Sequence, residues 1–282
     1  MENRDLIASV LQEALPYINY LVNKTIVIKL GGNALDEQET ILQDIVWLRS
    51  LRANPVLVHG GGPHISAWLK RIGKETRFIN GLRVTDDETM TVARMVLVGQ
   101  INQELVRLIA KLGGRAIGLS GLDGAMIRAW REDEALGLVG RVDSTSLDLR
   151  PIQMLIERGY IPVIAPVALG EHGECLNINA DTVAAEIARA MHAEKLILLT
   201  NVIGICDRAG NLISELTVSK TLDLIEQGVI TGGMIPKVHA CIHALDTVHR
   251  THIIDGRIPH VLIRELFTDG GAGTMITHDR DP

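Results

Sequence analysis

Short apolar runs alternate with longer amphipathic segments along nearly the whole chain. Residues 25–28, 55–58 and 195–199 are rich in Val, Ile and Leu and end at a glycine or polar turn, which is typical of buried strands in a parallel sheet. Residues 90–109 and 181–191 instead repeat apolar residues at helical spacing. Because strands and helices alternate from end to end, we predict an α/β fold, a mostly parallel open sheet with helices on both faces.

An amphipathic segment precedes the first predicted strand. Residues 6–15 have apolar residues at helical spacing before Pro16, and we predict an amphipathic helix. This helix can either pack on its own chain or contact another subunit. Further along, a polar turn at residues 170–174 is a candidate boundary between two lobes. The predicted parts are an N-terminal helix over 1–23, one lobe over 24–172 and a second lobe over 173–282.

Composition narrows the class of protein. The chain has 282 residues, of which 46% are hydrophobic and 22% are charged, with a net charge of -6 and a pI of about 5.9. An acidic chain with few aromatic residues does not indicate a nucleic-acid surface, and no apolar run is long enough to span a membrane. Three widely spaced cysteines fit a reducing compartment. We predict a cytoplasmic protein without nucleic-acid or membrane partners.

Two glycine-rich turns give the first indication of chemistry. Residues 29–32 (Lys-Leu-Gly-Gly) and 59–63 (His-Gly-Gly-Gly-Pro) each follow a predicted strand. Glycine at the end of a strand lets a ligand approach the backbone, and the N-terminus of a following helix offers free N–H groups to an anion. Either turn by itself is equally compatible with a tight strand-to-helix connection. The two turns together with Lys29 indicate a crevice for a phosphate or a carboxylate.

Several common catalytic motifs are absent from the sequence. It contains no Gly-x-x-x-x-Gly-Lys-Ser/Thr or Gly-x-Gly-x-x-Gly loop, no Gly-x-Ser-x-Gly elbow and no His-Glu-x-x-His pair. His239 and His243 share a predicted helix face, with His249 and His252 close behind, but no third ligand is nearby in sequence. We therefore predict no metal-binding residues.

Five motifs occur in one order along the chain. They are Lys-Leu-Gly-Gly (29–32), His-Gly-Gly-Gly-Pro (59–63), Asn-Gly-Leu-Arg-Val-Thr (80–85), Asn-Ile-Asn-Ala-Asp (177–181) and Gly-Gly-Met-Ile-Pro-Lys (232–237). Their order and spacing resemble the amino acid kinase family, and within it the acetylglutamate kinases, over most of the chain. The third and fourth motifs are the more selective, since other kinases of the family share the first two loosely.

The resemblance implies transfer of the γ-phosphoryl group of ATP to the side-chain carboxylate of N-acetyl-L-glutamate, the second step of arginine biosynthesis. The residue types agree with this chemistry. A carboxylate with a pKa of about 4.3 is ionised at neutral pH, so it needs no general base. It needs charge cancellation and in-line positioning beside a polyanionic nucleotide. Mg²⁺ is implied as an ion bound through ATP, with few protein ligands.

The resemblance also implies roles for single residues. Lys29 and Lys237 stabilise the transferring phosphoryl group, and Asp181 lies between them and holds both ammonium groups. Gly61 and Gly62 are implied to contact the reacting end of the substrate, and Arg83 and Asn177 its α-carboxylate. Gly31 and Gly32 are implied to contact the phosphates. The residues implied to contact the nucleotide are Thr200, Asn201, Gly204 and Gly232.

Each of these assignments has an ordinary structural alternative. Lys29 can be a surface lysine at the end of a strand, and Asp181 can be a helix cap. Arg83 can be a cation beside a hairpin, and Asn177 a turn residue. Their place within five ordered motifs favours the functional roles. Asn201 departs from the family, whose members usually carry Asp there, and it changes a charge near the expected nucleotide pocket.

The N-terminal segment, Glu265 and residues 271–274 resemble the arginine-inhibited members of the family. In those members the N-terminal helix interlaces with another dimer to give a hexamer, a trimer of dimers, and arginine binds beside that helix. The resemblance therefore implies a homo-oligomer that is inhibited by L-arginine.

Two other functions stay open at this point. One is a kinase of the same family with another acceptor, such as acetylaminoadipate or uridylate; Arg83 in its motif speaks against uridylate only. The other is a non-catalytic, ligand-sensing subunit, and the presence of Lys29, Asp181 and Lys237 together speaks against it.

Overall fold

A computed structural model describes residues 2–31, 39–268 and 270–279. The strands are β1 (Thr25–Leu30), β2 (Asn54–His59), β3 (Phe78–Ile79), β4 (Leu82–Arg83), β5 (Ala116–Ser120), β6 (Arg128–Arg131), β7 (Val139–Arg141), β8 (Ile161–Ala165), β9 (Val167–Gly170), β10 (Cys175–Ile178), β11 (Lys195–Thr200), β12 (Glu215–Thr217), β13 (Arg250–Asp255) and β14 (Gly273–Thr277). The helices are α1 (Glu2–Leu21), α2 (Glu39–Ser50), α3 (Gly62–Arg71), α4 (Asp87–Arg94), the π-helix η2 (Met95–Asn102), α5 (Gln103–Lys111), α6 (Arg150–Glu157), α7 (Ala180–Ala190), α8 (Val218–Glu226), α9 (Met234–Ala244) and α10 (Val261–Phe267).

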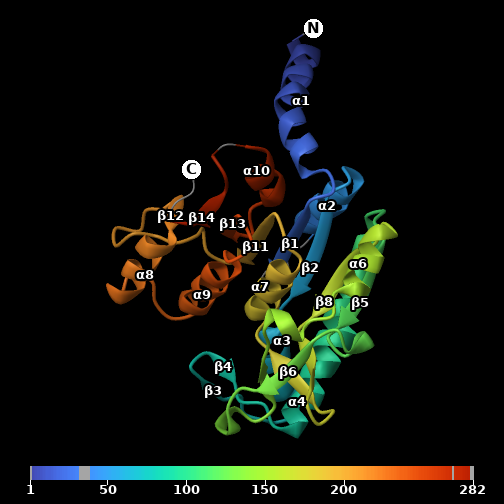
Figure 1. Ribbon diagram of the computed structural model, residues 1–282, viewed down its shortest axis with the longest axis vertical. Helices are drawn as coiled ribbons and strands as arrows, with labels where there is room; N and C mark the ends of the chain where they lie inside the picture. Colours follow the sequence, from blue (N-terminus) through green and yellow to red (C-terminus); the bar gives the residue numbers. More distant parts are fainter. Residues whose placement is uncertain (1, 32–38, 269, 280–282) are drawn as a thin grey trace.

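Eight strands form a central sheet in the order β12-β14-β13-β11-β1-β2-β8-β5. Neighbouring strands are parallel throughout, apart from the antiparallel pair β13–β14. The prediction of a mostly parallel open sheet is therefore confirmed. A small closed barrel of β6, β7, β9 and β10 and the β3–β4 hairpin lie at the end of the molecule away from α1 (Figure 1). The hairpin turns at Asn80 and Gly81, both with positive φ.

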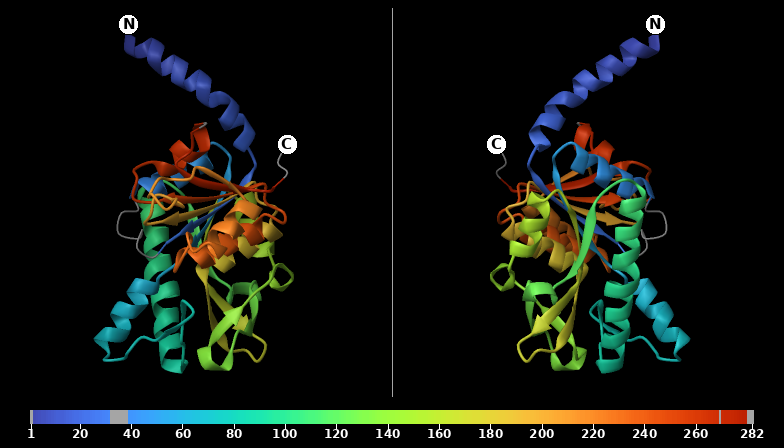
Figure 2. Two further views of the ribbon diagram at one scale, coloured as in Figure 1. Left: turned by 90° about the vertical axis from the view of Figure 1, so that its left-hand side faces the viewer. Right: turned by 90° about the vertical axis from the view of Figure 1, so that its right-hand side faces the viewer.

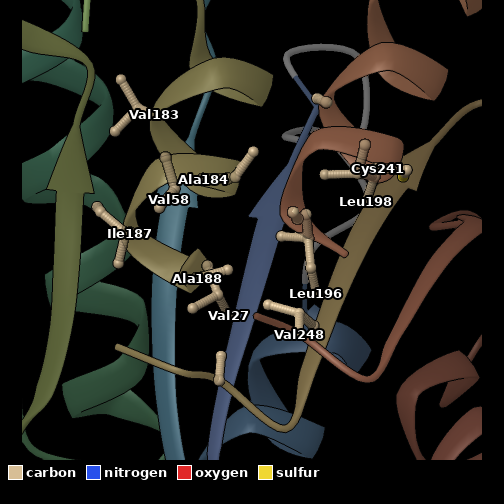
Figure 3. Close-up of a cluster of buried hydrophobic side chains, with 14 of the residues drawn as sticks. Val27, Val58, Val183, Ala184, Ile187, Ala188, Leu196, Leu198, Cys241 and Val248 are labelled. Atoms are coloured by element: carbon tan, nitrogen blue, oxygen red, sulfur yellow. The ribbon is translucent and has the colours of Figure 1, made fainter. Parts of the chain in front are cut away.

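Two apolar cores lie on opposite faces of this sheet, because successive side chains of a strand point to opposite sides. On β1, Ile26 and Ile28 pack in the core that includes α2, α3, η2, α5 and α10. Val27 packs in the other core, with α6, α7 and α9. Figure 3 shows residues of α7 lying over Val27 of β1 and Val58 of β2. Lys29 follows Val27 by two positions, so its side chain is directed to the face that α7 covers.

Helix α1 extends beyond the apolar residues at 6–15, since it continues through Pro16 to Leu21. A proline inside a helix removes one backbone hydrogen bond and can bend the helix without ending it. Figure 2 shows α1 curving away from the sheet, and the Tyr17 ring at its C-terminal end contacts Phe267 of α10. The apolar residues further out, Val10 and Leu11, are exposed.

The predicted long helix after the hairpin is present, but it is not uniform. It begins as α4, becomes π-helical over η2 and ends as α5. The predicted boundary between the lobes falls in the turn between β9 and β10, which pair antiparallel, and the division into lobes stays a prediction. No helix within the described part of the chain is long and apolar enough to cross a membrane.

Candidate active site

The two glycine turns lie side by side at the carboxyl edge of the central sheet. Leu30 of β1 is in register with His59 of β2, and the Gly60 N–H donates to the Leu30 carbonyl at 2.9 Å. Ligands of open parallel sheets bind beyond this edge of the strands. The structure thus brings the two predicted turns into one crevice. Gly32 lies outside the described residues.

A buried carboxylate joins two lysines at this edge. Asp181 is in the first turn of α7, where the Asn179 side chain accepts a hydrogen bond from its N–H. Its Oδ1 lies 2.8 Å from Lys29 Nζ and its Oδ2 lies 2.8 Å from Lys237 Nζ. Lys237 is in the first turn of α9, which packs against α7. Three residues far apart in sequence therefore form one cluster, with Asp181 between the lysines.

The charges of this cluster depend on one another. Burial lowers the pKa of Lys29, and Asp181 opposes that shift. Burial by itself would raise the pKa of Asp181, but the two ammonium groups outweigh it and lower that pKa to about 2. Asp181 is therefore an anion at neutral pH. Two cations around one anion leave a net positive charge, which attracts a phosphoryl group or a carboxylate.

Arg83 forms another part of the predicted site. Its Nη2 donates to the Gly62 carbonyl at 2.8 Å and to Ser66 Oγ at 2.9 Å, and its guanidinium lies over the Phe78 ring at 4.8 Å. Its Nη1 is buried and has no hydrogen-bond partner among the described residues. A buried, unpaired guanidinium nitrogen costs free energy unless an anion binds to it. Arg83 is thus fixed in place with one donor nitrogen left for a ligand.

Asn177 is connected to Arg83 through a residue without a predicted role. The Asn177 amide donates to Thr85 Oγ1 at 3.4 Å, and the Thr85 hydroxyl donates to the Arg83 carbonyl at 2.8 Å. Thr85 is fully buried. Its place at the end of the 80–85 motif was the only signal for it in the sequence. In the structure, Thr85 connects Asn177 and Arg83, the two residues predicted to bind the carboxylate.

These groups line a common pocket of about 200 Å³. Its lining includes the predicted residues Lys29, Gly61, Gly62, Arg83, Asn177 and Asp181. The lining thus combines the Lys29–Asp181 pair with Arg83. A small molecule with two anionic groups matches this arrangement.

Gly31 is placed close to the neighbouring strand β11. Its N–H donates to the Leu199 carbonyl at 3.2 Å, and a Cβ at this position would lie 2.9 Å from the same oxygen. Glycine is therefore needed here for close approach of the backbone. The Gly31 N–H already donates within the sheet, so this geometry gives no support for its predicted contact with phosphates. That contact stays a prediction.

The predicted nucleotide residues lie apart from this pocket, after β11 and before α9. The Thr200 hydroxyl is occupied within its own loop, since it donates to the Val202 carbonyl at 2.9 Å. Gly204 has a φ of 139° and packs against Thr274 of β14. Asn201 and Gly232 are exposed. Among the described lining of the 200 Å³ pocket, none of these four residues is present.

No three His, Cys, Asp or Glu residues in the described ranges are close enough together to hold a metal ion. His243 instead contacts Glu186 at 2.6 Å, and His252 contacts Glu265 at 2.7 Å. Two of the four clustered histidines thus pair with separate carboxylates.

Comparison with known proteins identifies the chain. The model of the amino acid kinase family matches residues 24–255. The protein belongs to the amino acid kinase family. Acetylglutamate kinase from Synechococcus elongatus (strain PCC 7942) is 51% identical over 275 residues, which cover 95% of this chain and 91% of that protein. The acetylglutamate kinase of Caldanaerobacter subterraneus subsp. tengcongensis is 49% identical over 278 residues, with 95% and 92% covered.

Two solved structures have a similar fold. The smu.665 protein from Streptococcus mutans UA159 has a TM-score of 0.80 and 30% identity, covering 90% of this amino acid kinase and 99% of that chain. N-acetylglutamate synthase from Neisseria gonorrhoeae has a TM-score of 0.85 over 97% of this chain, at 24% identity. The present chain spans 64% of the length of that synthase, and the likeness supports the fold alone.

Proposed function

We propose that this amino acid kinase transfers the γ-phosphoryl group of ATP to the side-chain carboxylate of N-acetyl-L-glutamate. The observation that carries the proposal is the Lys29–Asp181–Lys237 cluster, because Lys29 and Asp181 line the same pocket as Arg83, whose Nη1 has no hydrogen-bond partner among the described residues. The relatives of about half identity named acetylglutamate kinase support the same acceptor.

In the proposed reaction, an oxygen of the substrate carboxylate forms a bond to the γ-phosphorus. The bond from that phosphorus to the β,γ-bridging oxygen breaks, and ADP leaves. Lys29 and Lys237 bind the equatorial oxygens of the transferring group and lower the cost of bringing two anions together. Asp181 contacts both ammonium groups and holds them in place. The Gly61 and Gly62 backbone adjoins the reacting carboxylate.

Acceptor selection is assigned to Arg83 and Asn177. Arg83 offers Nη1 to the α-carboxylate of the substrate, and Asn177 is held beside it through Thr85. The fixed separation between Arg83 and the lysine cluster then selects the length of the dicarboxylate. A longer acceptor, such as acetylaminoadipate, must bend or displace one end.

The nucleotide is assigned to the loop that contains Thr200, Asn201 and Gly204, and to the turn at Gly232. Mg²⁺ is expected to enter with ATP and to neutralise charge on its phosphates. Both oxygens of Asp181 already face lysines, so this carboxylate is not free to bind a metal. That donor set fits an ion held mainly by phosphate oxygens and water.

Trapping with hydroxylamine tests the proposed reaction, because it converts an acyl phosphate to a stable hydroxamate. The acceptor panel is N-acetyl-L-glutamate, N-acetyl-L-aminoadipate and uridylate, each with ATP and Mg²⁺. We expect hydroxamate with N-acetyl-L-glutamate at the highest kcat/KM. A higher value with the aminoadipate would establish the alternative acceptor, and no hydroxamate with either amino acid would contradict the proposal.

We further propose that L-arginine inhibits the enzyme by binding beside α1. A cavity of about 690 Å³ lies between α1 and the β11–β14 side of the sheet, and its lining includes Tyr17, Glu215, Glu265 and Arg250. Carboxylates there suit a guanidinium ligand, and a cation suits its α-carboxylate. We expect millimolar arginine to inhibit the intact chain and to lose this effect after deletion of residues 1–20. Citrulline, which lacks the charge, is the control; an intact chain insensitive to arginine would contradict the proposal.

The exposed apolar residues of α1 support the proposal of a homo-oligomer. Val10, Leu11 and Leu15 lie on a helix that projects from the molecule (Figure 2). A second copy of α1 can cover them, and the resemblance to the arginine-inhibited members leads us to expect a hexamer built as a trimer of dimers. Light scattering of the intact chain and of the chain without residues 1–20 tests this. Equal masses would contradict a role for α1 in assembly.

The free thiols of Cys175, Cys206 and Cys241 support a cytoplasmic site of action.

A further inference from the structure

His59, at the end of β2, is a fully buried histidine directly before the glycines of the acceptor site. Its Nδ1 lies 3.0 Å from the Gly60 carbonyl oxygen. Its Nε2 lies 3.2 Å from the side-chain amide nitrogen of Asn102. Both ring nitrogens therefore have a partner, one on the glycine turn and the other on η2.

These two contacts allow only one protonation state of a neutral ring. A carbonyl oxygen can only accept, so Nδ1 must carry the proton and donate it to Gly60. Nε2 is then the acceptor for the Asn102 amide. Burial lowers the pKa of His59 to about 4, and the nearby charge of Lys29 acts in the same direction. The ring is therefore neutral at physiological pH.

The orientation of Asn102 is fixed as well. Its amide nitrogen also donates to the Val163 carbonyl of β8 at 2.9 Å. A flipped amide would place its oxygen against that carbonyl, so only the present orientation makes the bond. Gly118 of β5 leaves the space for this side chain, because a Cβ there would lie 1.8 Å from Asn102 Oδ1.

The π-helix η2 is what directs Asn102 toward His59. In an α-helix, which turns about 100° per residue, position 102 would lie roughly 140° around the axis from position 97. Hydrogen bonds from i to i+5 bring position 102 back to nearly the face of position 97. Leu97, Ile101 and Asn102 are all buried, as is Val96. A Cβ on Gly61 would lie 2.6 Å from both Leu97 and Ile101, so η2 also supports the turn directly.

We propose that Asn102 and His59 are positioning residues that aim the Gly61 N–H at the acceptor carboxylate. The carbonyl and the N–H of a trans peptide point in opposite directions. When His59 holds the Gly60 carbonyl, the N–H of Gly61 in the same peptide is held pointing away from the ring. Asn102 acts through the ring: its amide donates to Nε2, which keeps the ring proton on Nδ1, where it can be donated to the Gly60 carbonyl. The inference rests on the proposed function for its kinetic consequence, while the tautomer can be measured without any reaction.

Two substitutions of His59 separate its two hydrogen bonds. In His59→Asn, the amide nitrogen takes the place of Nδ1 and can still donate to the Gly60 carbonyl. In His59→Gln, the amide oxygen takes the place of Nε2 and can still accept from Asn102, but the donor to Gly60 is lost. We expect His59→Gln to lower kcat about 100-fold and His59→Asn to lower it less than about tenfold. The KM for ATP should change by less than about twofold in both.

A merely structural role predicts the opposite order, because Gln fills more of the cavity left by the ring than Asn does. Equal values of kcat, or a higher kcat for His59→Gln, would therefore overturn the inference. Asn102→Leu should lower kcat as His59→Gln does, and the double variant should lose no more than either single one. Leu105→Ala, at a buried position further along the same helix, is the control. It should lower the melting temperature and leave kcat unchanged within about twofold.

The NMR spectrum of protein labelled with ¹⁵N at histidine tests the tautomer independently of the activity. We expect His59 to be protonated at Nδ1 and not at Nε2 between pH 6 and 8, and to exchange tautomers in Asn102→Leu. A ring protonated at Nε2 in the unsubstituted protein would overturn the inference even if the kinase reaction is established. If that protein forms no acyl phosphate although the Nδ1 tautomer is found, the proposed function fails, and so does the assigned purpose of this hydrogen bond.

Discussion

The two sides of the proposed site are built differently. The acceptor side consists of Gly61, Gly62, Arg83 and Asn177, and the nucleotide side consists of Thr200, Asn201, Gly204 and Gly232. On the acceptor side, hydrogen bonds join Arg83 to Gly62 and Ser66 and, through Thr85, to Asn177. On the nucleotide side, Asn201 and Gly232 are exposed, and the Thr200 hydroxyl is used within its own loop.

This difference indicates where selectivity resides. The acceptor side is preorganised by buried polar groups, so an unsuitable acceptor leaves donors unpaired, which costs more than a lost contact. The nucleotide side offers few fixed side chains, and we expect it to tolerate substitution better. We accordingly expect substitutions to have large effects at the cluster between the two sides, intermediate effects on the acceptor side and small effects on the nucleotide side.

Asp181→Asn should have the largest effect, because Asp181 holds one lysine from each side of the cluster. The amide cannot balance the buried charge of Lys29, and we expect a loss of about 3 kcal/mol in the free energy of unfolding. We also expect kcat to fall about 1000-fold. Urea denaturation and the hydroxamate assay measure the two quantities. Glu104→Gln, which removes an exposed ion pair with Arg107, should change stability by less than about 1 kcal/mol. Similar losses for both variants would contradict this view of the cluster.

Lys237→Ala should mainly lower kcat, by about 1000-fold, because its ammonium group acts on the transition state. Its side chain is more exposed than that of Lys29, 24% against 8%, so the fold should tolerate the change. Steady-state kinetics with both substrates varied would measure it. A large rise in either KM with kcat retained would show that Lys237 binds a ground state instead.

Stability should fall in mild acid because of His59 on the acceptor side. Its pKa is about 4 in the folded chain, against about 6.5 for an unfolded histidine. Between these values the unfolded chain binds the extra proton, so the free energy of unfolding decreases as the pH drops from about 6.5 to about 4, by about 3 kcal/mol. Urea denaturation across this pH range should show a correspondingly smaller decrease in His59→Asn. The exposed His172→Asn is the matched control, and identical pH dependence in the two variants would refute the assignment.

Arg83→Ala should raise the KM for N-acetyl-L-glutamate about 100-fold, since it removes a charge-assisted contact to the α-carboxylate. The KM for ATP should stay within about twofold if the two sides are independent. Arg83→Lys keeps the charge but loses the planar donors that reach Gly62 and Ser66, so it should recover only part of the affinity. A change mainly in kcat would contradict a binding role.

Asn201→Asp should have the smallest effect. It introduces a carboxylate at an exposed position, where solvent screens charge. We expect the KM for ATP to change by less than about threefold and the KM for the acceptor not to change. Titration with ATP at two salt concentrations would measure this. A larger shift would show that the nucleotide side depends on fixed side chains after all.

Local sequence signals predicted most of the fold. Short Val- and Ile-rich runs gave the strands, and Asn80-Gly81 gave the hairpin, because these depend on neighbouring residues only. Helix α1 continues past Pro16, because one proline does not outweigh helix-forming residues on both sides. The π-helix η2 could not be predicted, because Leu97 and Ile101 satisfy α-helical spacing equally well. The only sequence feature that distinguishes η2 is the polar Asn102 within an apolar stretch.

The site was predicted from motifs, whereas its geometry required the fold. Strand alternation explains why Lys29 faces α7, but only the sheet order places Asp181 and Lys237 beside it. The path from Asn177 through Thr85 to Arg83 joins segments about 90 positions apart, and a single sequence carries no signal for such a contact. The same holds for the pair of His59 and Asn102.

The transfer of ¹⁸O from the acceptor tests the central claim most directly. N-acetyl-L-glutamate labelled at both side-chain carboxylate oxygens is incubated with ATP, Mg²⁺ and hydroxylamine, and the released phosphate is analysed by mass spectrometry. Hydroxylamine attacks the acyl carbon, so the phosphate departs with the bridging oxygen. If the carboxylate attacks the γ-phosphorus, each phosphate will carry one ¹⁸O atom. Phosphate without ¹⁸O would mean that water is the nucleophile and would contradict the proposed carboxylate phosphorylation.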